Sequence, residues 1–264
     1  MFNIKGKDSD KYFQEVEDKL VEETNYDLEI SQSKEIAKSC AHIPNLLFPE
    51  YYEDYSSDRI ITMDFMKGEH LSVFTKYNTD KKKSNQLGQA LWDFYMFQIH
   101  TLKKVHADPH PGNFLVNEDT QLIALDFGCM KSIPNNFYTP YFELSNVNTI
   151  NDPVSFKKKL YELEILTPND TKEELAFFTN MFHELLSVFT LPFHNEIFDF
   201  SNPEFFNKIG ELSESYSKNT ELRKFNANRG SKHFIYINRT FFGLYSLMFD
   251  LKASNVKINQ FKNY

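Results

Sequence analysis

Residues 105–130 read VHADPHPGNFLVNEDTQLIALDFGCM, and the interpretation of the whole chain starts from them. Asp108 and Asn113 lie five positions apart on a proline-rich loop. Two short apolar runs follow, separated by the polar residues 117–120, and this pattern predicts a β-hairpin. The hairpin would return the chain to the loop, so we expect Asp126 to lie beside Asn113.

This spacing suits phosphoryl transfer. The reaction needs an aligned acceptor and Mg²⁺ ions that neutralise charge on the phosphate oxygens. Asp108 would orient or deprotonate the acceptor, while Asn113 and Asp126 would hold Mg²⁺, which prefers hard oxygen ligands and keeps several waters. Gly128, two residues after Asp126, would allow the backbone conformation that turns this carboxylate inward. The pattern therefore predicts the catalytic loop and metal loop of a kinase-like phosphotransferase that binds ATP and magnesium.

The octapeptide HADPHPGN at 106–113, followed by LDFG at 125–128, resembles the UbiB/AarF family of atypical, protein-kinase-like proteins. Ala107 and Pro109 favour this family over the choline and aminoglycoside kinases, which share only the HxDxHPxN outline. The resemblance implies an ATP-dependent phosphotransferase or ATPase in ubiquinone or isoprenoid-lipid metabolism. It also implies a kinase-like fold of the α+β class, mainly α, with a helical C-lobe.

Two other enzyme classes are alternatives to this interpretation. A small-molecule kinase of the choline or aminoglycoside type would use the same loops on a different acceptor. A metal hydrolase would take His106, Asp108 and His110 as ligands, but alternate loop residues beside two prolines seldom converge on one ion. A further alternative is a catalytically inactive fragment that acts as a binding module. We expect His106 to be architectural, holding the metal loop through a backbone hydrogen bond, rather than to carry a proton.

Composition narrows the class of protein. The 264 residues carry a formal net charge of -8, which argues against a nucleic-acid partner because such surfaces are normally basic. Only two cysteines occur, so neither a disulfide framework nor a thiolate metal site is expected, and the cytoplasm is the predicted compartment. Expected partners are a nucleotide, lipid or quinone-pathway proteins, and a membrane surface contacted peripherally.

Residues 9–40 have helical periodicity and predict one long or broken helix that begins at Asp8 or Ser9. In UbiB proteins a comparable helix carries a Glu-x-Asp pair and a second Glu four residues later. Glu23 and Glu29 match the two glutamates, and the resemblance assigns both to the cofactor site. Asn25 replaces the aspartate of that pattern.

The stretch RIITMDF at 59–65 predicts a buried strand, and MKGEHL after it resembles the hinge between kinase lobes. Met63 would approach the adenine from the back of the pocket. The backbone of residues 64–67 would face the adenine edge, which gives the cofactor-binding candidates Met63, Asp64, Phe65, Met66 and Lys67.

The remainder of the chain is predicted to be helical. Residues 84–104 form an amphipathic helix that leads into His106, with Trp92 used for packing. After Cys129 we expect helices near 137–147, 153–165, 171–190, 203–216 and 232–253. Arg239 in the last of these is expected to be a buried ion-pair partner, and the alternative is a surface charge. No Ala-Pro-Glu follows Gly128, which points away from peptide substrates.

The resemblance divides the chain into two parts. Residues 1–67 would be a partial kinase N-lobe with one acidic helix, two strands and the hinge, and residues 68–264 the helical C-lobe. The KxGQ segment, the Ala-rich loop and the strand lysine of UbiB proteins have no counterpart in this sequence, so the chain resembles an N-terminally truncated member. Without that lid over the phosphates, weak activity in isolation is expected.

Overall fold

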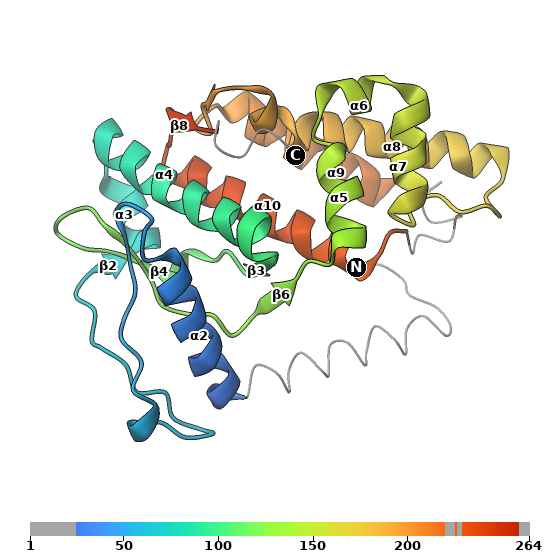
Figure 1. The fold of residues 1–264 in the computed structure, drawn as a ribbon. Coiled ribbons are helices and arrows are strands. Elements are labelled where there is room, and N and C mark those ends of the chain that lie inside the picture. Colours follow the sequence, from blue (N-terminus) through green and yellow to red (C-terminus); the bar gives the residue numbers. More distant parts are fainter. Residues whose placement is uncertain (1–24, 220–224, 226–228, 259–264) are drawn as a thin grey trace.

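The computed structural model describes residues 25–219, 225 and 229–258. Nine described helices surround short strands (Figure 1), and the fold is mainly helical with a small sheet. The helices are α2 (Tyr26–Cys40), α3 (Leu71–Tyr77), α4 (Lys81–Phe97), α5 (Asn135–Glu143), α6 (Val147–Asn151), α7 (Pro153–Glu162), α8 (Lys172–Phe189), α9 (Pro203–Lys218) and α10 (Lys232–Asp250). The α+β, mainly α expectation is therefore confirmed.

The described strands are two or three residues long. They are β1 (Leu46–Leu47), β2 (Glu69–His70), β3 (Lys104–His106), β4 (Phe114–Val116), β5 (Leu122–Ala124), β6 (Met130–Ser132), β7 (Ile197–Phe198) and β8 (Val256–Lys257). Four of them form a sheet in the order β1-β5-β4-β2, in which β4 and β5 are the expected hairpin. Strands β3 and β6 pair separately and lie directly before the catalytic loop and directly after the metal loop. These two pairings fix both loops in space.

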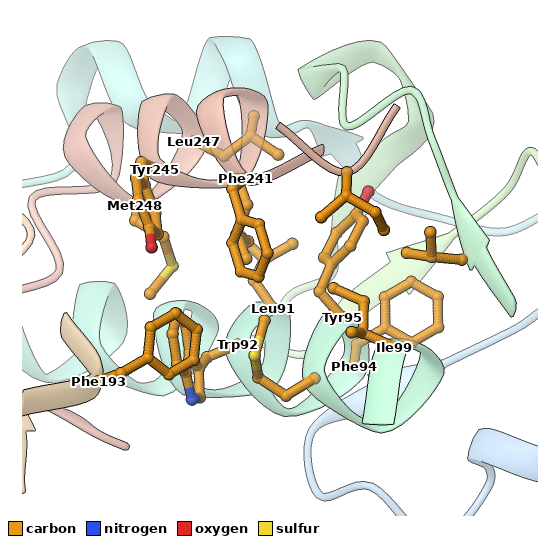
Figure 2. Close-up of a cluster of buried hydrophobic side chains, with 14 of the residues drawn as sticks. Leu91, Trp92, Phe94, Tyr95, Ile99, Phe193, Phe241, Tyr245, Leu247 and Met248 are labelled. Carbon is orange, nitrogen blue, oxygen red and sulfur yellow. The ribbon is translucent and has the colours of Figure 1, made fainter. Parts of the chain in front are cut away.

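Helices α4 and α10 run side by side through the molecule (Figure 1) and hold a cluster of buried hydrophobic side chains between them. Figure 2 shows Leu91 and Trp92 of α4 facing Phe241 and Tyr245 of α10. All four side chains are buried. The predicted packing role of Trp92 is correct. Aromatic rings bury large apolar areas, so this cluster anchors the C-terminal helix under the catalytic loop.

Helix α4 ends differently from the expectation. Its α-helical part stops at Phe97, and residues Gln98–Leu102 continue as a π-helical turn. Lys103 then adopts a left-handed conformation with φ of 53°. Such turns interrupt the regular hydrogen-bond ladder and often occur near functional sites. Here the turn precedes β3 and brings the side chain of Gln98 under His106.

The segment around RIITMDF is not a buried strand, which corrects the expectation. Ile60 is 60% exposed and Phe65 is 90% exposed. Within the described residues the segment makes only isolated bridges, Tyr51 with Met63 and Ser57 with Ile60. An apolar run forms a buried strand only where a sheet offers it a partner edge, and the four-stranded sheet does not extend to this segment. The other expected strand of this region is present as β1.

The acidic helix is described from Tyr26 onward. Asn25 caps it by accepting a hydrogen bond from the Leu28 backbone N–H at 3.0 Å, as Asn commonly does at this position. The expected start at Asp8 or Ser9 lies outside the described residues. One face of α2 is buried through Ile30, Ile36 and Cys40, and this directs Glu29 toward the metal loop.

Candidate active site

The catalytic loop is held at both ends by backbone hydrogen bonds. His106 pairs with Met130 across β3 and β6, and the next residue, Ala107, donates its N–H to the Cys129 carbonyl at 2.9 Å. Within the loop, the His110 N–H donates to the Asp108 carbonyl at 2.8 Å. These bonds fold residues 108–113 into a compact turn beside the metal loop.

Asn113 connects the two loops that carry the carboxylates. Its Nδ2 donates to the Asp108 carbonyl at 3.1 Å, and its own carbonyl accepts from the Leu125 N–H at 3.0 Å. Leu125 directly precedes Asp126. These hydrogen bonds hold the catalytic loop against the residue that precedes Asp126. The convergence of the three side chains on one position, and their catalytic and metal-binding roles, stay predictions.

Asp126 is exposed, and its Oδ1 accepts the Gly128 backbone N–H at 2.8 Å. The expectation for Gly128 was wrong in its physical reason. The residue does not have a positive φ, so it supplies no conformation that other residues lack. A Cβ added there would stand 3.4 Å from Glu29 Oε2, an ordinary contact distance. Its backbone N–H, not its flexibility, orients the aspartate.

Glu29 approaches the metal loop from α2. Burial raises the pKa of its carboxyl to about 7, and the negative charge of Asp126 adds to this shift. An ion pair helps to hold α2 here, because Lys104 Nζ of β3 lies 2.7 Å from Glu35 Oε2. Glu29 therefore lies close to Asp126, and its expected role in the cofactor site stays a prediction. Glu23, the other glutamate of the pattern, lies outside the described residues.

His106 lies beneath the loops and is buried. Its backbone N–H donates to Gln98 Oε1 at 2.9 Å, so the π-helical turn supports the catalytic loop at this point. Burial lowers the pKa of the His106 imidazole, and the carboxylates of Asp126 and Asp108 partly oppose that shift. This bond goes to the π-helical turn and not to the metal loop, so the expected role of His106 in holding the metal loop stays a prediction. Gln98 was missed, because a π-helical turn has no simple periodicity in the sequence.

Arg239 reaches the catalytic loop from α10. Its Nη2 donates to Asp108 Oδ1 at 2.7 Å, and the two side chains are 63% and 45% exposed. The ion pair exists, but the expectation that it is buried was wrong, because both side chains are largely exposed. The partner residue is 131 positions away in the sequence, and no local pattern could have identified it.

The hinge candidates lie apart from the carboxylates but are connected to them. Met63 forms a bridge with Tyr51, whose hydroxyl donates to the Leu125 carbonyl at 2.7 Å. The Asp64 N–H already donates to the Glu50 carbonyl at 2.9 Å, and its carboxylate accepts from Tyr52. The remaining candidates, Phe65, Met66 and Lys67, are exposed or half-buried. Their contact with a nucleotide stays a prediction.

The residues present fit a magnesium ion. Asn113 and Asp126 offer oxygen donors on adjoining loops, and Glu29 places a second carboxylate near Asp126. Two neighbouring carboxylates repel each other, and a divalent cation between nucleotide and protein would relieve that repulsion. The transition-metal alternative has no support in the described residues. They contain no group of three histidine, cysteine, aspartate or glutamate side chains that could hold an ion, and His110 is exposed with its Nδ1 accepting the Gly112 N–H.

The fold of this chain is similar to that of a protein of known structure. A Mycobacterium tuberculosis protein in complex with erythromycin has a structure similar to 94% of this chain, with a TM-score of 0.71. The sequence identity is 18% and the match spans 60% of that protein, so the likeness concerns the fold alone. The described helices, with the two loops and their small sheet, form a kinase-like fold.

Residues 1–158 match the ABC1 atypical kinase-like domain. The chain belongs to this atypical kinase-like family, which agrees with the AarF resemblance of the sequence. The Arabidopsis thaliana protein ACTIVITY OF BC1 COMPLEX KINASE 8, chloroplastic, is 27% identical over 64% of this chain and 23% of its own length. The Saccharomyces cerevisiae atypical kinase COQ8, mitochondrial, is 26% identical over 75% of this chain and 39% of its own length.

The chain thus spans between about a quarter and two fifths of the length of these relatives. Their names place them in chloroplasts and mitochondria, so the cytoplasmic location of this chain stays a prediction. Within residues 25–219 and 229–258, no helix combines the length and apolar character that a membrane span requires.

Proposed function

We propose that this chain carries the catalytic and metal loops of an ATP-dependent phosphotransferase or ATPase that uses Mg²⁺. The observation that carries the proposal is the hydrogen-bonded connection of Asp108, Asn113 and Leu125-Asp126 across two loops. Kinase-like sites need these oxygen donors to face one nucleotide position. Asn113 and Asp126 would hold the metal, which neutralises charge on the phosphates when it is bound.

The transfer step assigns Asp108 to the acceptor. The acceptor oxygen forms a bond to the γ-phosphorus, while the bond from that phosphorus to the bridging oxygen breaks and its electron pair leaves with ADP. The proton of the acceptor hydroxyl passes to Asp108. With water as the acceptor, the same arrangement hydrolyses ATP. Glu29 and His106 support the loops, and residues 63–67 would receive the adenine.

Ubiquinone or isoprenoid-lipid metabolism is the process we infer for this activity. Support comes from the family, whose relatives include proteins named COQ8 and COQ8B. Quinone-pathway proteins, lipids and a peripheral membrane contact are the partners that such a role would require. Peptide substrates fit less well, because no Ala-Pro-Glu platform follows the metal loop.

Turnover of ATP by the purified chain tests the proposal. ADP formation should require Mg²⁺ and should fall by roughly 10² or more in Asp108→Asn, as expected when a general base is lost. Asp126→Asn should abolish it. A chain that binds Mg-ATP without any Asp108-dependent turnover would instead favour the binding-module alternative.

A further inference from the structure

Two cationic side chains from distant parts of the chain lie along α10 near the catalytic loop, and one of them contacts Asp108 directly. Arg239 is one of them, through its 2.7 Å hydrogen bond to Asp108 Oδ1. A guanidinium has five N–H donors in a rigid plane. The contact with Asp108 is made by Nη2 alone, and 63% of the side chain is exposed. Arg239 can therefore hold Asp108 and bind a second anionic group at the same time.

Lys131 is the second cation. It lies on β6 and pairs with Val105 of β3. Val105 precedes Asp108 by three residues in the sequence. Its Nζ stands 4.9 Å from the centre of the Tyr236 ring. Tyr236 precedes Arg239 by three positions on α10, so the two side chains are neighbours on one helix face. We call Lys131, Tyr236 and Arg239 the basic rim.

The charges around the site are separated by sign. Glu29 and Asp126 lie together on the α2 side, where Asn113 completes the candidate magnesium position. The basic rim lies along α10, where Arg239 contacts Asp108 and Lys131 contacts the Tyr236 ring. This arrangement is notable in a chain whose net charge is -8, because it is not a consequence of a generally basic surface. If the metal holds the nucleotide on the α2 side of the site, the acceptor would bind on the α10 side.

We propose that the acceptor of this site is an alcohol that carries a phosphate or carboxylate group close to its reacting hydroxyl. The inference rests on the proposed phosphotransferase function. The basic rim binds the anionic group, and Asp108 receives the hydroxyl. Charge-assisted hydrogen bonds from Arg and Lys to such anions are stronger than those between neutral groups. A cationic amino alcohol would instead meet repulsion from Lys131 and Arg239.

Calorimetric titration of the purified chain, with and without Mg-ADP, tests this proposal. The probes are glycerol 3-phosphate, glycerol and ethanolamine, which are an anionic, a neutral and a cationic alcohol. Glycerol 3-phosphate should bind at least about tenfold more tightly than the other two, a ratio that corresponds to one charge-assisted contact. Vesicles of phosphatidylglycerol in phosphatidylcholine provide the same chemistry as a lipid head group, and pure phosphatidylcholine vesicles are their control.

Substitutions in the basic rim test whether its residues bind the anionic probes. Lys131→Gln and Arg239→Gln should each weaken glycerol 3-phosphate or vesicle binding by about fivefold or more, with partial rescue in Lys131→Arg. Lys157→Gln changes an exposed lysine of α7 and should have no effect. Thermal melts verify that each variant is folded.

The outcomes distinguish the proposal of an anionic acceptor from the proposed phosphotransferase function. Selectivity for the soluble phosphate, or for the anionic vesicles, supports the basic rim if it is lost in Lys131→Gln. Ethanolamine binding as tightly as glycerol 3-phosphate, or anion binding unchanged in both rim variants, overturns it. Absence of Mg-ADP binding would overturn the phosphotransferase function instead, and the titrations without nucleotide would still test the rim.

Discussion

Gly243 of α10 lies against Pro109 of the catalytic loop so closely that a Cβ added to the glycine would stand 2.3 Å from Pro109 Cγ and 3.0 Å from its carbonyl oxygen. Arg239 is one helical turn earlier on the same helix and contacts Asp108. The C-terminal helix therefore supports two consecutive residues of the catalytic loop. This close approach requires a residue without a side chain.

The substitution Gly243→Ala tests that support. The new methyl group would collide with a proline ring and a backbone oxygen, so we expect a loss of about 1–3 kcal/mol in the free energy of unfolding. Gly210→Ala is the matched control, because nothing lies within 4 Å of a Cβ added there in α9. That control should gain about 0.5–1 kcal/mol from helix propensity. Urea unfolding of both variants measures the difference, and equal effects would contradict the packing described.

Glu29→Gln tests the two carboxylates near the candidate metal position. Burial, with a smaller contribution from the charge of Asp126, raises the pKa of Glu29 in the folded chain to about 7 from the ordinary value of 4.5. The protonated group therefore favours the folded state below pH 4.5, and this contribution is lost as the pH rises through 7. We expect Glu29→Gln to raise the melting temperature relative to wild type at pH 8 more than at pH 5, without added Mg²⁺. A pH-independent difference between the two proteins would show that burial and the Asp126 charge do not raise the pKa of Glu29.

His100 supplies a second pH dependence, of opposite sign. Burial, with a smaller contribution from Lys103, lowers the pKa of its imidazole from 6.5 to about 3. Stability from the neutral ring is fully present above pH 6.5 and is lost as the pH falls toward 3. Its Nδ1 lies 2.8 Å from the Tyr138 hydroxyl, beside the Phe142 ring.

His100→Phe keeps an aromatic ring in this position and removes the titration. The variant should be less stable than wild type at pH 7.5 and should lose less stability between pH 7.5 and pH 5. Denaturant midpoints at the two pH values provide the measurement. Parallel losses in both proteins would exclude His100 as the titrating group.

Gln98→Leu tests the π-helical turn as a support of the catalytic loop. The change removes the acceptor of the buried His106 backbone N–H, a loss expected to cost about 1–3 kcal/mol. Gln89→Leu is the control, because Gln89 is a half-buried residue of α4 whose side chain accepts from Lys257. Hydrogen exchange of the His106 amide should accelerate in Gln98→Leu only. Unchanged exchange there would mean that another group holds the loop.

The sequence predicted the parts of the site that depend on the order of neighbouring residues along the chain. A polar turn between two apolar runs defines the hairpin, and the hairpin alone is enough to bring Asn113 to the residue before Asp126. Five of the described helices after Cys129, α5 and α7 to α10, were predicted for the same reason, since their apolar periodicity is local. The short helix α6 and the strands β6, β7 and β8 were not predicted, which corrects the expectation of a wholly helical remainder. Thr171, for example, begins α8 with a complete capping box.

Contacts between distant segments were not predictable. Arg239 meets Asp108 because α10 packs on α4 through aromatic side chains, a tertiary contact without a local signature. The strand expected at 59–65 failed for a related reason. Its composition suits a strand, but a strand is buried only when a neighbouring edge pairs with it, and within the described residues Met63 and Ile60 make isolated bridges only.

The central claim is that Asn113 and Asp126 hold magnesium and nucleotide while Asp108 serves the acceptor. Titration of a fluorescent ATP analogue into wild type, Asp126→Asn and Asp108→Asn tests it most directly, with and without Mg²⁺. We expect Mg²⁺-dependent binding in wild type and Asp108→Asn, and its loss in Asp126→Asn. Equal Mg²⁺-dependent binding by wild type and Asp126→Asn would contradict the account.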